Sequence, residues 1–186
     1  MRCLTVLLLL AAIAGCGGTR STGSFGDVTV ALGSSPGAND VGVYMAQARG
    51  FDEAEGLTLK VSDQRPDLRL MSDSQLRREP GWVGVMAIVQ PAKLVLAARR
   101  DWLDEDRRRC AASVRALQRG YLQAQLEPEE AVQAMATQVP GLDSAAVLSQ
   151  LDTAAPSWSA GAPFLGALPA GREFDRSVAA AQPVNQ

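Results

Sequence analysis

The sequence predicts an α/β fold, a mostly parallel β-sheet flanked by helices. Residues 28–32 (VTVAL) and 57–61 (LTLKV) are short runs rich in β-branched and aliphatic residues, as buried strands are. Between them, residues 39–50 carry apolar side chains at helical spacing. A strand, a helix and a second strand in this order predict a βαβ unit, in which the two strands lie parallel in one sheet.

The first strand leads into residues 33–37 (GSSPG), which consist of turn-forming residues. A helix is expected from about Asn39, and it ends near Gly50 because glycine favours the helix C-terminus. The apolar face of this helix contains Val41, Tyr44, Met45 and Ala48.

The next segments predict further elements of the same lobe. Residues 68–78 are expected to be helical, residues 82–89 to form a third strand and residues 94–97 a fourth. Gln90 and Pro91 close the third strand. Four strands upstream favour a sheet covered by the helices that follow.

The second half predicts a series of helices. One face of a long amphipathic helix is formed by Cys110, Val114, Leu117 and Tyr121. Pro128 is expected in the first turn of the next helix, and Asp143 is expected to cap a third. Beyond Pro156 we expect extended packing around Trp158 and Phe164, followed by a loose tail at residues 169–186.

Composition excludes several functions. Hydrophobic residues make up 47% of the chain and charged residues 20%, as in an ordinary globular domain. The net charge of −2 gives no basic surface, so we expect no nucleic-acid partner. The chain has no histidine, which excludes Ser-His-Asp and Cys-His catalysis and histidine-containing zinc sites. We therefore expect no enzymatic activity, no metal and no cofactor.

The N-terminus predicts an export signal. Arg2 precedes an apolar run at residues 4–13, and small residues lead into Cys16. The sequence around Cys16 resembles a bacterial lipobox, which implies a signal peptide at residues 1–15 and a lipidated, flexible tether at residues 16–26. An ordinary signal peptide with an incidental cysteine is the alternative. Lipidation of Cys16 would place the protein on the extracytoplasmic face of the cell membrane.

Cysteine usage fits an exported protein without an internal disulfide. Cys3 leaves with the signal peptide and Cys16 carries lipid, so Cys110 is the remaining cysteine. We expect Cys110 to be a small residue of the core.

Several segments then resemble a known family, the solute-binding lipoproteins of ABC importers. The similar segments are residues 28–32, 43–46 (VYMA), 49–57 (RGFDEAEGL), 83–91 (VGVMAIVQP), 100–103 (RDWL), 116–121 (ALQRGY) and 139–142 (VPGL). The most similar group takes thiamine pyrimidine precursors, nitrate, sulfonates and taurine. The resemblance implies a type II periplasmic-binding-protein-like lobe at residues 27–168.

The chain also departs from this family. Family members have two lobes, and the second would be inserted between Gln90-Pro91 and Lys93, where only Ala92 intervenes. We therefore expect the second lobe to be largely missing. Residues 65–81 are also compressed, and we expect them to lack a strand.

The carboxyl ends of parallel strands are the usual ligand position in such sheets, which predicts a site around the first loop. Ser34 and Ser35 offer hydroxyls, and the helix beginning near Asn39 offers free N–H groups to a polar or anionic ligand. Asp40 lies where pyrimidine-binding members commonly carry a histidine, and Tyr44 is a candidate stacking residue. A plain turn capped by Asn39, with Tyr44 as a packing residue, is the alternative.

Two functional hypotheses follow from the resemblance. In the first, the protein is a lipid-anchored substrate-binding component that delivers a small molecule to an ABC permease. In the second, it is an internally deleted, non-binding surface lipoprotein or remnant of that family.

Overall fold

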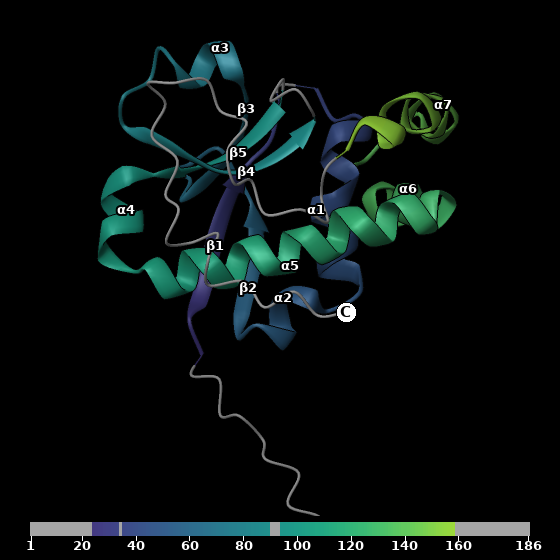
Figure 1. Cartoon of the computed structure of the whole chain (residues 1–186). Coiled ribbons are helices and arrows are strands. Elements are labelled where there is room, and N and C mark those ends of the chain that lie inside the picture. The colour runs from purple at the N-terminus through teal and green to yellow at the C-terminus, as the bar shows by residue number, and fades with distance from the viewer. Residues whose placement is uncertain (1–23, 34, 90–93, 159–186) are drawn as a thin grey trace, which may run out of the picture.

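A five-stranded sheet forms the centre of the protein (Figure 1). The structure, a computed structural model, describes residues 24–33, 35–89 and 94–158. The strands are β1 (Gly26–Ala31), β2 (Leu57–Val61), β3 (Leu68–Ser72), β4 (Trp82–Val89) and β5 (Leu94–Arg99), in the order β2-β1-β3-β5-β4. The α/β fold class is thus confirmed.

One strand of the sheet, β5, runs opposite to the other four. β1 pairs parallel with β2 and with β3, as the βαβ pattern predicts. β5 runs antiparallel to both of its neighbours, β3 and β4. β4 therefore points in the same direction as β1, β2 and β3, and the mostly parallel sheet predicted from the sequence contains one antiparallel strand, β5. The reason is the short connection between β4 and β5, because only an antiparallel neighbour can be reached without a long crossover.

The helices confirm most of the predicted pattern. They are α1 (Val41–Ala48), α2 (Phe51–Ala54), α3 (Asp73–Leu76), α4 (Arg100–Glu105), α5 (Arg107–Leu126), α6 (Pro128–Ala136) and α7 (Ser144–Ala154), with 3₁₀ turns η1 (Ala38–Asp40) and η2 (Ala155–Ser157). Pro128 opens α6, and Asp143 caps α7 by accepting a hydrogen bond from the Ala146 amide at 3.0 Å. The predicted apolar face of α5 is buried, Cys110 included.

The helix predicted over residues 68–78 is wrong. Residues 68–72 form β3, and only the single turn of α3 follows, with Ser72 as its N-cap. β3 lies between β1 and β5, and both of its faces are covered: Leu68 and Leu70 pack on one side and Met71 on the other. The strand is only five residues long and passes directly into α3, and a short apolar run of this kind does not distinguish a strand from a helix in the sequence. The strand expected to be missing from residues 65–81 is therefore present as β3.

Several predicted features lie outside the described residues. These are the signal peptide, Cys3, Cys16, most of the tether, Ser34, the Gln90-Pro91 segment, Phe164 and the tail at residues 169–186. Among the described helices, none combines the length and the hydropathy needed to cross a membrane.

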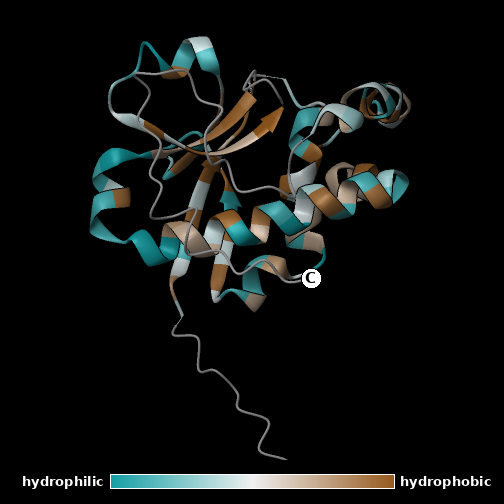
Figure 2. Ribbon diagram, in the orientation of Figure 1, coloured by the Kyte–Doolittle hydropathy of each residue, from teal (hydrophilic) through white to brown (hydrophobic). Residues whose placement is uncertain are grey.

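The main core lies between one face of the sheet and the helices α1, α5, α6 and α7. A smaller apolar cluster on the other face joins α3 to β3, β4 and β5. Figure 2 shows apolar residues along the strands and mainly polar residues in α4. The core supports the carboxyl ends of β1 and β3, where the candidate site lies.

Helix α1 crosses α5 at a tight contact, which two glycines permit. A Cβ atom on Gly42 would lie 2.5 Å from the ring of Tyr121. A Cβ on Gly120 would overlap the carbonyl oxygen of Gly42 and lie 2.7 Å from the Cβ of Ala46. The two backbones can approach this closely only because both positions lack a side chain.

Replacing Gly120 by alanine should therefore destabilise the fold. Because the new methyl group would meet backbone rather than a flexible side chain, we expect the free energy of unfolding to fall by about 3 kcal/mol. Urea unfolding measures this loss. Gly81→Ala is the matched control, since a Cβ there meets nothing within 4 Å. Equal stability of both variants would contradict the tight crossing.

Candidate functional site

A cleft of about 880 Å³ opens at the carboxyl ends of β1 and β3. It is lined by Leu32, Gly33, Ser35, Gly37, Ala38, Asn39, Asp40, Asp63, Arg69, Leu70, Met71, Ser72, Gln75, Leu94, Gln150 and Ala154. The position is the one predicted from sequence for a ligand site in an open α/β sheet. Helix α7 contributes Gln150 and Ala154 because it packs against η1.

The loop between β1 and α1 forms one wall of the cleft. Asp40 is 3% exposed, and its Oδ2 accepts a hydrogen bond from the Gly37 amide at 2.9 Å. This bond closes the turn of η1, so Gly37 and Asp40 take the capping role that the alternative interpretation gave to Asn39. The side chain of Asn39 is exposed and lines the cleft.

Burial changes the acidity of Asp40. Removal of the carboxylate from water raises its pKa from 3.8 to about 6, and hydrogen bonds from the amides of Gly37 and Gly33 partly oppose this rise. The carboxylate is thus ionised at neutral pH but titrates in the mildly acidic range. It is the most perturbed acidic group of the cleft wall.

The two tyrosines near this wall are buried. Tyr44, predicted as a ligand residue, lies in α1 with 4% exposure and is not among the residues that line the cleft. Burial and the nearby charge of Asp40 raise the pKa of Tyr44. Tyr121 of α5 donates a hydrogen bond from its hydroxyl to the carbonyl oxygen of Asn39 at 2.6 Å, and burial raises its pKa well above the usual value.

The cleft therefore brings together three of the predicted site residues, Ser35, Asn39 and Asp40. It also contains polar residues that sequence reasoning missed: Asp63, Arg69, Ser72, Gln75 and Gln150. For Asp63 the available signal was its position directly after the second predicted strand. Gln150 had no local signal, because it reaches the cleft only through the packing of α7.

Among the described residues that line the cleft, Arg69 is the one cation, and its guanidinium has two neighbours. Its Nη1 lies 3.1 Å from Oε2 of Glu79, and its guanidinium lies 4.7 Å from the ring centroid of Trp82. Within the described part of the chain, no group of three or more histidine, cysteine or acidic residues is placed to bind a metal ion.

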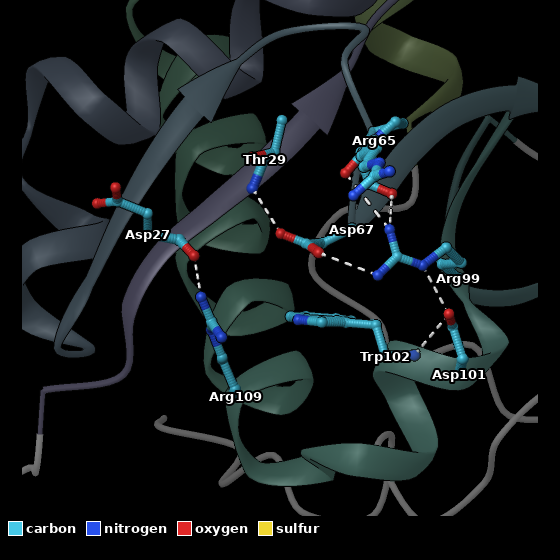
Figure 3. Close-up of polar contacts among 9 residues, drawn as sticks. Asp27, Thr29, Arg65, Asp67, Arg99, Asp101, Trp102 and Arg109 are labelled. Carbon is cyan, nitrogen blue, oxygen red and sulfur yellow. Dashed lines mark hydrogen bonds and ion pairs between the residues drawn. The ribbon is translucent and has the colours of Figure 1, made fainter.

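A second polar cluster surrounds the start of β3 (Figure 3). Asp67 accepts a hydrogen bond from the Thr29 amide at 2.9 Å and lies 3.7 Å from Nη2 of Arg99. Arg99 also donates to the Pro66 carbonyl at 3.2 Å and to Oδ1 of Asp101 at 2.6 Å. These groups satisfy one another and connect β1, the loop before β3 and the end of β5. We therefore interpret the cluster as structural.

The fold and the cleft define a class, an α/β lobe with a ligand-sized cleft at the carboxyl edge of its sheet. No family model and no curated protein matches the chain. Among solved structures, it is similar to the CA3427 gene product of Candida albicans, described as defining a new family with the generic periplasmic binding protein fold. The TM-score is 0.55 at 8% identity, covering 72% of this chain and 82% of that chain. The periplasmic-binding-protein-like fold predicted from the sequence is thereby confirmed.

The titration of Asp40 should appear in the pH dependence of stability. The pKa of Asp40 in the folded state, about 6, exceeds the ordinary value of 3.8. Between these two pH values the folded state therefore binds more protons than the unfolded state. Its contribution to stability is therefore full below about pH 4 and is lost as the pH rises through 6. Asparagine cannot ionise, so Asp40→Asn should gain up to roughly 3 kcal/mol relative to the wild type over this range.

The difference in unfolding free energy between the wild type and Asp40→Asn is measured by chemical denaturation. The pH series runs from about 3.5 to about 7.5, which spans the two pKa values. Asp152→Asn, at an exposed position of α7, is the control and should show no such gain. A wild-type-minus-variant difference that stays constant with pH would contradict the raised pKa of Asp40.

Proposed function

We propose that this protein is a lipid-anchored, extracytoplasmic substrate-binding component of an ABC importer. The observation that carries the proposal is the polar cleft of about 880 Å³ at the carboxyl edge of a periplasmic-binding-protein-like sheet. A volume of this size lies within the range of small-molecule sites. Binding rather than catalysis is the function that these features support best.

The resemblance to solute-binding lipoproteins supports the more specific parts of the proposal. It suggests a pyrimidine precursor, a sulfonate or nitrate as the ligand, and an ABC permease as the partner. The lipobox-like sequence at Cys16 supports anchoring by lipid. More than one acyl chain is needed for stable attachment, which a modified N-terminal cysteine can provide.

The described residues contain a single sheet, so the cleft is covered from one side. Two-lobed receptors enclose their ligand by hinge closure, and one lobe supplies only part of those contacts. We therefore expect weaker binding than in a two-lobed receptor. The competing hypothesis, a non-binding remnant, predicts no saturable binding at all.

A thermal-shift titration of the full-length chain in detergent tests binding. The panel contains a thiamine aminopyrimidine precursor, taurine, an alkanesulfonate and nitrate. A saturable rise in melting temperature with one compound is expected, because a ligand that binds only the folded state stabilises it. If no compound shifts the melting temperature up to millimolar concentration, the non-binding hypothesis is favoured.

A variant that fills the cleft tests whether the ligand binds there. Gln150 is exposed at the cleft wall, so Gln150→Trp should be tolerated by the fold and occupy ligand space. We expect the affinity to fall by about tenfold or more. Gln133→Trp, at an exposed position of α6, is the matched control and should bind like the wild type. Equal loss in both variants would place the ligand elsewhere.

Membrane attachment is tested by fractionation of bacterial cells that express the full-length chain. Cys16→Ser should move the protein from the membrane to the soluble fraction and abolish incorporation of labelled palmitate, because the thiol that carries the lipid is absent. Cys3→Ser is the control, since Cys3 lies within the expected signal peptide. Unchanged membrane attachment of Cys16→Ser would argue against the lipid anchor.

A further inference from the structure

The charges that line the cleft are unequal. Among the described residues that line the cleft, the charged ones are Asp40, Asp63 and Arg69. The guanidinium of Arg69 is paired with the carboxylate of Glu79, which offsets its charge locally, and it also lies over the Trp82 ring. Two carboxylates remain at the cleft wall, one buried and one exposed. Within the described lining, acidic side chains therefore outnumber basic ones, and this balance favours a cationic ligand.

The position where an oxyanion would bind is already occupied. Backbone amides in a loop that enters a helix are the usual donors to a bound anion. Here the amides of Gly37 and Gly33 hydrogen-bond to the carboxylate of Asp40, with the Gly37 nitrogen 2.9 Å from Oδ2. The protein thus supplies its own anion at this loop. A sulfonate or nitrate would have to displace it or lie beside it.

We propose that the cleft selects a small organic cation with N–H donors, such as an amidinium, a guanidinium or a protonated amino heterocycle, over an oxyanion. The inference rests on the proposed binding function and narrows its ligand class. Asp63 at the cleft wall accepts from such a cation, and Asp40 contributes its negative charge. The hydroxyl and amide groups of Ser35, Asn39 and Gln150 supply the uncharged polar contacts.

The pH dependence of binding should follow Asp40. The neighbouring groups that face it are Tyr44 on α1 and Tyr121 on α5, whose pKa values are raised, so both stay neutral. Asp63 and Arg69 are the other titratable groups among the described residues that line the cleft. Because the pKa of Asp40 is about 6, a cation should bind more tightly at pH 7.5 than at pH 5 (about one unit on either side of that value).

Three probes of nearly equal shape and different charge test the proposal. Benzamidine is a cation, benzamide is neutral and benzoate is an anion across this pH range. Their affinities for the full-length chain in detergent are measured by equilibrium dialysis. We expect benzamidine to bind best and benzoate worst, with about a tenfold or larger ratio between them. Benzamidine should also weaken at pH 5.

A variant at the exposed carboxylate provides the second measurement. Asp63→Asn changes an exposed loop residue, so the fold should persist, and benzamidine affinity should fall by about threefold. Glu105→Gln removes the same charge from exposed α4 and is the matched control, for which we expect no change. Equal effects of the two variants would overturn the local role of Asp63.

The outcomes separate this inference from the proposed function. If benzoate, or one of the oxyanions of the thermal-shift panel, binds better than benzamidine, the binding function stands and the charge preference is overturned. If neither the probes nor the panel compounds bind at millimolar concentration, the proposed function fails, and the charge preference fails with it.

Discussion

The contact between α1 and α5 at Gly42 and Gly120 is the constraint on which the candidate site depends. It lets the ring of Tyr121 lie directly against the backbone of α1, so that its hydroxyl reaches the carbonyl of Asn39. This bond connects the longest helix to η1, the turn that forms the cleft wall. A side chain at either glycine would separate the helices and move the wall away from the sheet.

Asp40 connects this packing to the chemistry of the cleft. Its carboxylate caps the loop that follows β1, and the same burial raises its pKa to about 6. A buried carboxylate is costly unless hydrogen-bonded, and the amides of the loop supply those bonds. The residue therefore shapes the loop and sets the electrostatic character of the wall.

The order of the strands places the β4–β5 connection at the same edge of the sheet as the cleft. β5 begins beside the end of β3 and runs back along β4, so that the carboxyl edge carries both the cleft and the short β4–β5 connection. In the family that the sequence resembles, a second lobe is inserted at this point. In the described part of this chain, no second sheet covers the same edge.

The sequence by itself determined the elements whose signals are local. The strands at β1 and β2, the buried face of α5 and the ends set by Pro128 and Asp143 follow from periodicity and capping, which act over a few residues. The tertiary structure alone decided that residues 68–72 form a strand, that β5 runs antiparallel and that Gln150 meets Asp40 at one cleft. These features depend on contacts between distant segments, because a five-residue strand is too short to identify by its own pattern and the packing of α7 against η1 leaves no pattern in the local sequence.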